Sequence, residues 1–413
     1  MKAVVFTLGC KVNECESDSL ITGLKNRGYE VSDKLCRADL YIVNTCAVTA
    51  EAEKKSRQTV SRIKKFNENA KIIFTGCAAE NNYGAFADKG KDILVTGVFD
   101  KMKILDALDR SGAYISPASD IYEELPFPSA LKTRAFVKVQ DGCNRFCSYC
   151  IIPYLRGRSR SRDPESAVRE IVALKAKETV ITGIDLSDYN YGGKGLDALI
   201  SLIAKSGINT RIRLGSLEER AITDGFLSAL CGLKNFAPHF HLSMQSGSNA
   251  VLLKMNRKYT IETFLEKVAL IRRYFPLAGI TTDVIAGFPT ETDDDFKQTL
   301  VAIMAAKFSD IHAFSFSPRK GTAAYKMPDL PAEVKKERLD RLMLEKSRLK
   351  ADFAGLMRGK TAEFLPEEYK NGYTDGYSEN YLRLYVKGDL VGRDITRVKV
   401  IGAYKDGATA ELI

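Results

Sequence analysis

Short apolar runs with the composition of buried strands recur along this 413-residue chain, and a helical segment follows most of them. One series places strands near residues 3–8, 40–44, 71–75 and 93–96. A second series consists of AFVKVQ, ETVITGI, RIRLGSL, HFHLSM, ITTDVIAGF and IHAFSFS. Alternating strands and helices form parallel sheets, because each helix returns the chain to the start of the next strand. The sequence therefore predicts an α/β fold built on two parallel sheets.

The two series predict different architectures. Residues 1–112 are expected to form a Rossmann-like parallel-sheet domain, and residues 113–133, with three prolines and no clear period, a linker. Six strand–helix units in residues 134–358 favour an open partial barrel over a closed eight-unit barrel, with functional residues at the carboxyl ends of the strands. Residues 359–413 change to short alternating segments separated by glycines, which predict a small all-β barrel or sheet.

Composition places the chain among globular proteins that act away from membranes. Hydrophobic residues make up 45% and charged residues 28%, and no run approaches the roughly 18 apolar residues of a membrane span. The amino terminus lacks the apolar stretch and cleavage site of a signal peptide, so we expect a cytoplasmic protein. A formal charge of +10 suits a polyanionic partner, and residues 113–358 carry most of it, with 36 Lys and Arg against 28 Asp and Glu.

Three cysteines fall within eight residues of the segment GCNRFCSYCIIP. Thiolates of Cys143, Cys147 and Cys150 on one loop can all bind a single iron–sulfur cluster, and three ligands leave one iron of a 4Fe–4S cluster open. An open iron can bind S-adenosylmethionine and split it reductively for radical chemistry. The alternative is a structural zinc site, but zinc needs four ligands, the next cysteine is the distant Cys231, and no histidine lies nearby.

Three further cysteines, Cys10, Cys46 and Cys77, each end one of the strands predicted in residues 1–112. The carboxyl ends of parallel strands meet at one edge of a sheet, so these thiols should gather despite their separation in sequence. We therefore expect a second iron–sulfur cluster, with three inert buried thiols as the alternative. Nine cysteines without a secretory signal favour metal or redox roles over disulfides. The remaining three have no partner pattern and are expected to be structural thiols: Cys15, Cys36 and Cys231.

The spacing C-x3-C-x2-C is the signature of the radical S-adenosylmethionine enzymes, and essentially the whole chain resembles their methylthiotransferase family. The resemblance rests on TLGCKVNECES, NTCAVT and TGCAAE in residues 1–112 and on HLSMQSGSNAVLLKMNRKYT at residues 241–260. Gln245-Ser246-Gly247 favours the branches that modify tRNA, because the branch that modifies a ribosomal protein typically has Gln-His there. Lys11-Val12-Asn13 resembles the threonylcarbamoyladenosine branch, whereas the isopentenyladenosine branch usually has Gln-Met-Asn.

This resemblance implies insertion of a methylthio group at C2 of N6-threonylcarbamoyladenosine at tRNA position 37, beside the anticodon. It implies two 4Fe–4S clusters, S-adenosylmethionine, an electron donor of the flavodoxin or ferredoxin type, the tRNA anticodon stem-loop as partner, and a monomer. An adenine C2–H bond is strong, barely acidic and has no leaving group, so a radical must abstract the hydrogen while a second cluster holds the sulfur. Open alternatives are isopentenyladenosine in tRNA, an aspartate of a ribosomal protein, and a non-catalytic iron–sulfur RNA-binding protein.

Residues near the ends of the predicted strands are candidates for binding S-adenosylmethionine: Tyr149, Gly183, Asp185, Ser216, Glu218, Gln245 and Gly287. The glycines are equally compatible with tight turns, and Ser216 and Glu218 with helix capping. Candidates for substrate or tRNA contact are basic or polar residues next to the two cysteine sets: Lys11, Asn13, Arg156, Arg158, Arg160 and Arg162. The threonylcarbamoyl group carries a carboxylate and needs a cation in its pocket, whereas the apolar isopentenyl group does not. Three histidines in apolar strands are expected to be core residues: His239, His241 and His312.

Three positions depart from the family pattern and affect the expected loop geometry. Thr290 stands where the family usually has glycine, Glu219 stands where it usually has proline, and Lys320 stands where proline is common. The tail resembles the TRAM RNA-binding module, yet residues 359–413 carry 8 Lys and Arg against 9 Asp and Glu. The tail is therefore expected to bind tRNA through a local patch or to contribute little affinity.

Overall fold

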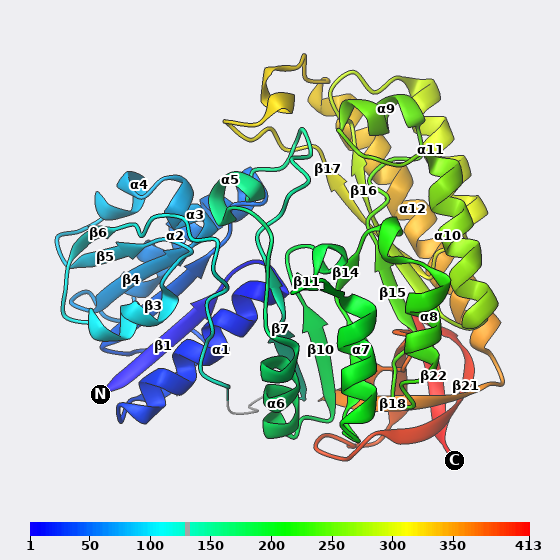
Figure 1. Ribbon diagram of the computed structural model, residues 1–413, viewed down its shortest axis with the longest axis horizontal. Coiled ribbons are helices and arrows are strands. Elements are labelled where there is room, and N and C mark those ends of the chain that lie inside the picture. Colours follow the sequence, from blue (N-terminus) through cyan, green and yellow to red (C-terminus); the bar gives the residue numbers. More distant parts are fainter. Residues whose placement is uncertain (129–132) are drawn as a thin grey trace.

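The computed structural model describes residues 1–128 and 133–413, in three parts that follow one another along the chain (Figure 1). The first part is a parallel sheet in the order β2-β1-β3-β4-β5-β6. Its strands are β1 (Lys2–Thr7), β2 (Glu30–Ser32), β3 (Leu40–Thr45), β4 (Lys71–Gly76), β5 (Ile93–Thr96) and β6 (Gly112–Tyr114). Every residue of β3 is buried, because both faces of a parallel sheet are covered.

The four strands expected from the sequence are β1, β3, β4 and β5, and the short edge strands β2 and β6 are additional. Residues 129–132, which belong to the predicted linker, lie outside the described residues. The helices of this part are α1 (Lys11–Asn26), α2 (Ala50–Lys64), α3 (Cys77–Asn81), α4 (Gly84–Ala87) and the 3-10 helix η1 (Lys101–Asp106). Helices α1 and α3 begin close to the carboxyl ends of β1 and β4, so their first residues lie at that edge of the sheet.

The second part is a partial barrel of parallel strands in sequence order, as expected. One sheet contains β7 (Arg134–Lys138), β10 (Glu178–Thr182) and β13 (Arg211–Leu214). The next contains β14 (Ser216–Leu217), β15 (His239–Leu242), β16 (Gly279–Ala286) and β17 (Asp310–Ser315). Only Gly215 separates β13 from β14, so the strands form one curved wall with β7 and β17 at its two edges. Helix α1 of the first part packs against β7 (Figure 1).

Helices cover the outer face of this wall (Figure 1). They are α6 (Pro164–Leu174), α7 (Leu196–Lys205), α8 (Asp224–Cys231), α10 (Ile261–Tyr274) and α11 (Asp293–Ala306). Helix α9 (Asn249–Lys254) lies at the top of the view in Figure 1, and α5 (Ile152–Arg156) lies against α3 of the first part. Asp163 caps α6 by accepting a hydrogen bond from Ser166 N at 3.0 Å, with Pro164 as the first helical residue, which confirms the expected helix start. Short elements complete the loops: β8 (Gln140–Asp141), β9 (Arg160–Ser161), η2 (Leu186–Asp188), β11 (Asn190–Tyr191), β12 (Lys194–Gly195), η3 (Glu219–Ala221) and η4 (Ala323–Lys326).

The third part closes the amino-terminal end of the barrel strands. Helix α12 (Ala332–Met357) packs along β16 and β17 and leads into a closed barrel of β18 (Thr361–Lys370), β19 (Tyr373–Tyr377), β20 (Arg383–Lys387), β21 (Thr396–Tyr404) and β22 (Gly407–Leu412). Arg211 Nη1 donates to Glu363 O at 2.9 Å and Arg213 Nη1 donates to Glu379 O at 3.0 Å. These bonds fasten the small barrel to the start of β13. Across the described residues, no helix is both long and apolar enough to cross a membrane.

Candidate functional site

The loop with three cysteines in residues 143–150 follows β7 at the carboxyl end of the partial barrel. The pairing of β8 with β9 holds the base of this loop, where Cys143 N donates to Gly157 O at 3.1 Å. Gly142 has a φ of +72°, and a Cβ at this position would lie 1.9 Å from Arg158 O. Only glycine fits there, so the glycine before the first cysteine has a steric cause.

Two later loops of the barrel clamp the cysteine loop. Ser148 N donates to Met255 O at 3.0 Å, and Asn256 Nδ2 donates to Phe146 O at 3.0 Å. From the loop after β17, Ala324 N donates to Ser148 O at 2.7 Å. The backbone between the first and last cysteines is therefore fixed, and the loop presents its thiols in a preformed arrangement.

A buried guanidinium lies beside this loop. Arg257 Nη1 donates to Cys147 Sγ at 3.5 Å and pairs with Glu218 Oε1 at 2.8 Å. Glu218 also pairs with Arg145 Nε at 2.8 Å. A cationic donor next to a thiol favours the thiolate that binds iron. The sequence interpretation missed this role of Arg257, although the residue belongs to the family-like segment 241–260.

Cys10, Cys46 and Cys77 lie at the carboxyl ends of the neighbouring strands β1, β3 and β4, as the sequence predicts. Gly9 has a φ of +112°, and a Cβ there would lie 3.0 Å from Cys46 Sγ. The loops after β1 and β3 therefore touch, and glycine is what permits the approach. Burial, together with the neighbouring Cys77 and Cys10, raises the pKa of Cys46 to about 11.

The two sets of thiols lie close to each other. Helix α3, which begins at Cys77, packs against α5, which follows Cys150. Burial raises the pKa of Cys150 to about 12, and Cys77 of the other set contributes to the rise. The two segments that carry the thiol sets are therefore packed against each other.

Arg156 is fully buried between Cys77 and the strand before the cysteine loop. Its Nε donates to Cys77 Sγ at 3.3 Å, and its Nη2 donates to Asn13 Oδ1 at 2.9 Å. Its Nη1 donates to Glu16 Oε1 at 2.9 Å and to Asp141 Oδ1 at 3.0 Å. One side chain of α5 thus connects α1, α3 and the strand before the cysteine loop.

These contacts correct the expectation that the arginines after the cysteine loop contact tRNA phosphates. Arg156, Arg160 and Arg162 are all buried. Arg160 pairs with Asp141 at 3.2 Å, and Arg162 pairs with Glu170. The expectation is wrong for these three residues, because their guanidinium groups already have carboxylate partners inside the protein.

Two more candidates for substrate or tRNA contact, Asn13 and Arg158, differ in burial. Asn13 is buried, and its Nδ2 donates to Leu8 O at 2.8 Å and to Thr45 O at 3.0 Å. It shapes the loops that carry the first thiols, so the expectation of tRNA contact is wrong for Asn13. Arg158 is exposed, with its guanidinium 4.6 Å from the centre of the Phe146 ring.

The thiols and their neighbours fit two iron–sulfur clusters. In residues 1–128 and 133–413, no three His, Cys, Asp or Glu side chains are arranged to hold a single metal ion. A 4Fe–4S cluster spaces its cysteine ligands more widely than one ion does, and three thiols without a fourth suit a cluster with an open iron. Arg257 beside one set and Arg156 beside the other supply the cationic donors that such clusters favour.

Glu16 is expected to make the protein sensitive to acid. Burial alone would raise the pKa of Glu16. The neighbouring Arg156, Lys101 and Lys138 outweigh this effect and lower the pKa of Glu16 to about 2. A carboxyl with a depressed pKa stabilises the fold above its unfolded value and loses this contribution as the pH falls. We expect this group alone to remove about 3 kcal/mol of unfolding free energy between about pH 5 and about pH 2.

Urea unfolding at several pH values measures this effect. Glu16→Gln should lower stability at neutral pH and flatten the profile between about pH 5 and about pH 2. Glu30→Gln, which changes an exposed carboxylate, is the control and should leave the profile unchanged. An unaltered acid slope in the Glu16→Gln protein would contradict the prediction.

Gly183 and Asp185 lie beside the base of the cysteine loop. A Cβ on Gly183 would lie 2.8 Å from Gln140 Oε1. Gln140 Oε1 in turn accepts a hydrogen bond from Asp185 N at 2.8 Å, and its Nε2 donates to Gly142 O at 2.8 Å. Burial, together with Glu218, raises the pKa of Asp185 to about 6. Gly183 therefore makes room for Gln140, while Asp185 and Glu218 form an acidic pair next to the loop.

Two other candidates adopt a left-handed backbone. Gln245 has a φ of +65° and Gly287 a φ of +70°. A Cβ on Gly287 would lie 2.3 Å from Lys335 Cγ of α12, so this glycine accommodates helix packing. Thr290 has a φ of +67° and thus keeps the conformation of the usual glycine, while Lys254 Nζ donates to its Oγ1 at 2.8 Å.

Tyr149 and Ser216 are both half-buried. The Tyr149 ring meets the Phe288 ring edge-on, with centres 6.5 Å apart. Of the two remaining departures from the family pattern, Glu219 is buried at the start of η3 and Lys320 is exposed.

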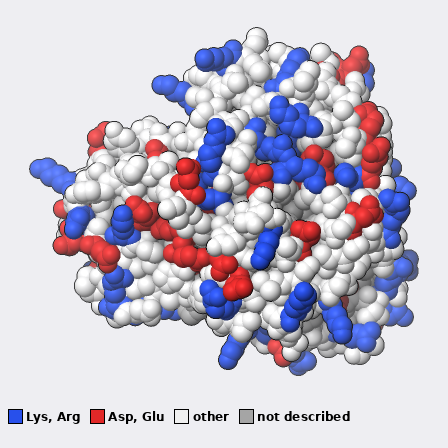
Figure 2. All heavy atoms as spheres, viewed as in Figure 1, with Lys and Arg blue, Asp and Glu red and all other residues white. Residues whose placement is uncertain are grey.

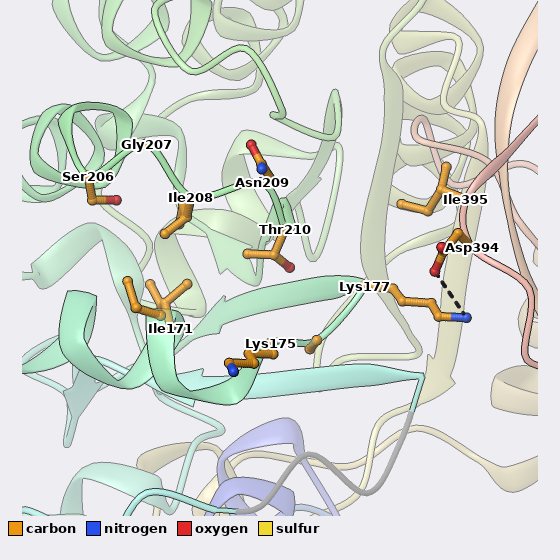
Figure 3. A pocket seen from close by; sticks show the side chains of 12 residues that line it. Ile171, Lys175, Lys177, Ser206, Gly207, Ile208, Asn209, Thr210, Asp394 and Ile395 are labelled. Atoms are coloured by element: carbon orange, nitrogen blue, oxygen red, sulfur yellow. Dashed lines mark ion pairs between the residues drawn. The ribbon is translucent and has the colours of Figure 1, made fainter.

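A wide recess of about 640 Å³ lies away from the thiols. It is lined by the segments around α6 and α7 and by Asp394 and Ile395 of the small barrel, with Lys177 Nζ 3.6 Å from Asp394 Oδ1 (Figure 3). These segments meet at the amino-terminal ends of β10 and β13. The cysteine loop lies at the other end of the barrel strands, so the recess plays no part in the site.

Comparison with known proteins decides the family. A family model described as the radical SAM superfamily matches residues 137–303, and one described as uncharacterized protein family UPF0004 matches residues 2–97. The chain is 38% identical to threonylcarbamoyladenosine tRNA methylthiotransferase MtaB of Bacillus subtilis, with 100% of this chain and 97% of the relative covered. The chain belongs to the radical SAM methylthiotransferase family. Within this family it is also 36% identical to the tRNA-2-methylthio-N(6)-dimethylallyladenosine synthase of Thermoanaerobacter sp. (strain X514), covering 87% of this chain and 81% of the relative.

Solved structures share the fold at low sequence identity. The radical S-adenosylmethionine methyltransferase TsrM from Kitasatospora setae aligns with a TM-score of 0.55 at 16% identity, over 76% of this chain and 74% of that one. The cobalamin-dependent radical enzyme OxsB aligns with a TM-score of 0.56 at 13% identity, over 84% of this chain and 56% of that one. These likenesses support the fold of this radical SAM methylthiotransferase.

Proposed function

We propose that this radical SAM methylthiotransferase modifies N6-threonylcarbamoyladenosine in tRNA. The observation that carries the proposal is the pair of three-thiol sets on packed segments, with α3, which begins at Cys77, against α5, which follows Cys150. The reaction combines two steps on one base, hydrogen abstraction and sulfur insertion, and each step needs its own cluster. The choice of base is supported by relatives named threonylcarbamoyladenosine tRNA methylthiotransferase, which are 37–39% identical to this chain.

The clusters, when bound, supply reductive cleavage of S-adenosylmethionine and a site for the sulfur. The chain would hold them through Cys143, Cys147 and Cys150 in the barrel and through Cys10, Cys46 and Cys77 in the first sheet. Arg257 donates to one set and Arg156 to the other, which stabilises the thiolates. The clamped cysteine loop keeps the reacting groups in fixed positions, so the adenine need only be placed between them.

Exposed cations around the cysteine loop support tRNA contact. Arg158, Lys254, Lys258 and Lys326 are exposed on or next to the loops that hydrogen-bond to one another there. In Figure 2, Lys and Arg gather near the upper centre of the face shown, while acidic residues spread over the first sheet domain at the left. These cations support contact between this face and the phosphates of the tRNA anticodon stem-loop.

The remaining partners follow from the chemistry of the reaction. Reductive cleavage needs an electron, which a flavodoxin- or ferredoxin-type donor supplies. The chain carries both thiol sets itself, so a monomer can supply both clusters. We propose that it acts in the cytoplasm, where its tRNA substrate is found.

Nucleoside analysis of tRNA from cells that lack this gene tests the substrate. We expect the methylthio form of threonylcarbamoyladenosine to disappear while its unmethylthiolated precursor remains. A plasmid copy should restore the product, and a Cys143→Ala copy should not. Loss of the methylthio form of isopentenyladenosine instead, or of a modified ribosomal-protein aspartate, would overturn the choice of substrate. Absence of 5′-deoxyadenosine after anaerobic incubation of reconstituted protein with dithionite and S-adenosylmethionine would contradict the enzymatic function.

A further inference from the structure

Two aromatic rings and one guanidinium form an accessible group on the cysteine loop and the segment that follows it. The Phe146 and Tyr154 rings meet edge-on, with centres 5.4 Å apart and planes at 83°. The guanidinium of Arg158 lies 4.6 Å from the centre of the Phe146 ring. Tyr154 is 57% exposed, Arg158 is exposed and Phe146 is half-buried. These three side chains, the stacking group, therefore offer aromatic surface and a cation to solvent.

The stacking group is not part of a hydrophobic core. Among the described residues, neither Phe146 nor Tyr154 joins a cluster of buried apolar side chains, whereas Tyr149 of the same loop does. Phe146 also has a φ of +46°, a left-handed conformation that a bulky residue seldom adopts. Asn256 Nδ2 holds this backbone by donating to Phe146 O at 3.0 Å. A strained and partly accessible ring indicates a role other than filling space.

Arg158 is a planar cation without an acidic partner. In residues 1–128 and 133–413, no ion pair or side-chain hydrogen bond holds its guanidinium, which lies on the Phe146 ring instead. Its backbone is fixed, because Arg158 O accepts from Arg160 Nη1 at 3.2 Å and lies where a Cβ on Gly142 would clash. Of the six residues expected to contact substrate or tRNA, only Lys11 and Arg158 are exposed. Arg158 therefore has a charged, flat surface available for a ligand.

The stacking group lies next to both segments that carry thiols. Phe146 belongs to the cysteine loop, and Tyr154 belongs to α5, which packs against α3, the helix that begins at Cys77. The exposed Lys258 is close by, because its Nζ donates at 2.6 Å to Asn256 Oδ1, and Asn256 in turn donates to Phe146 O. Cations attract RNA phosphates, whereas aromatic rings and guanidinium planes stack on unpaired bases. Both kinds of group thus meet beside the cysteine loop.

We propose that Phe146, Tyr154 and Arg158 stack against the base of a nucleotide that adjoins the methylthiolated adenosine in the anticodon loop. This inference rests on the proposed function. An adenine that reacts at C2 must leave the stack of bases, so the base beside it loses a neighbour. The stacking group replaces that neighbour with a ring or a guanidinium plane, and every base offers a suitable face. The group therefore recognises an unpaired base without reading its identity.

Binding of anticodon stem-loops with one base removed tests the proposal. Each RNA carries N6-threonylcarbamoyladenosine and is either intact or abasic at the nucleotide before or after it. One of the two abasic RNAs should bind the reconstituted enzyme more weakly than the intact RNA does. Tyr154→Ala should weaken binding of the intact RNA about 5- to 150-fold, the usual effect of removing an aromatic stacking partner. The same variant should have no further effect on that abasic RNA, because the base that stacks is already missing.

Conservative variants and a matched control separate stacking from charge. Tyr154→Phe should keep the affinity, because it keeps the ring. Arg158→Lys should weaken binding of the intact RNA with an unchanged salt dependence, because lysine keeps the charge but not the plane. Tyr114→Ala is the control, since Tyr114 is 53% exposed on β6, an edge strand of the first sheet. It should bind every RNA as the unaltered enzyme does.

Four results would overturn the proposal. Equal weakening of intact and abasic RNAs by Tyr154→Ala, or a lower iron content of that protein, would mean that the ring only holds the cysteine loop. Full affinity of Arg158→Lys with a smaller salt dependence of Arg158→Met would assign the guanidinium to a phosphate. Unchanged binding of both abasic RNAs by the unaltered enzyme would show that no neighbouring base stacks, while threonylcarbamoyladenosine remains the substrate. Failure of the unaltered enzyme to bind the intact RNA would instead reject the proposed function itself, and the stacking group with it.

Discussion

Replacing Cys10 with alanine is expected to leave the enzyme with about half of its iron and no methylthiolated product. Cys10, Cys46 and Cys77 end three adjacent strands, and removal of one thiolate leaves a cluster with two protein ligands. The other thiol set lies in a loop clamped by hydrogen bonds within the barrel, so it keeps its cluster. Cleavage of S-adenosylmethionine without product should therefore continue in part.

Iron analysis measures the loss of a cluster, and 5′-deoxyadenosine formation separately measures the loss of S-adenosylmethionine cleavage. Cys143→Ala should also remove about half of the iron, but it should abolish cleavage of S-adenosylmethionine as well. Cys231→Ala is the matched control, because Cys231 is exposed and far from both thiol sets along the chain, and it should retain all iron. A Cys10→Ala protein with its full iron content would contradict the assignment of two clusters.

The first sheet was predictable because its central strands are buried on both faces. Strand β3 is apolar enough to be found from sequence alone, since helices shield it from both sides. Edge strands β2 and β6 are only three residues long and largely unburied, so they lack this signal. The gathering of Cys10, Cys46 and Cys77 was predictable for a related reason: parallel strands end at one edge, and a residue placed there is near the other strand ends.

The burial of the arginines that follow the cysteine loop could not be predicted from sequence patterns. Arg156, Arg158, Arg160 and Arg162 follow the cysteine loop and resemble a phosphate-binding series, but only Arg158 is exposed. Their burial depends on acidic partners that are distant in sequence; Glu16, for example, lies 140 positions from Arg156. No local pattern reveals such a pair. Of the three histidines expected in the core, His239 and His241 are buried, whereas the expectation is wrong for His312, which is exposed.

Arg156→Met is expected to lower the free energy of unfolding by about 3–5 kcal/mol, the cost of removing one partner from a buried ion pair. Arg156 is fully buried, and methionine fills a similar volume without a charge. Glu16 retains Lys101 and Lys138, at 3.3 and 3.6 Å, but loses its closest cation. Cys77 loses its hydrogen-bond donor altogether, so the cluster in the first sheet should be affected more than the one in the barrel.

Urea unfolding and the reduction potentials of the two clusters measure these effects. Arg156→Lys restores a charge but cannot reach Cys77, Asn13 and the acids together, so it should recover only part of the stability. Arg27→Met removes an exposed arginine that pairs with Asp106, and this control should cost less than about 1 kcal/mol. Loss of a donor to sulfur should lower the potential of the cluster at Cys77 and leave the other nearly unchanged. Equal shifts in both clusters would contradict this, because they would indicate general loosening of the fold rather than loss of one hydrogen bond to one set of thiolates.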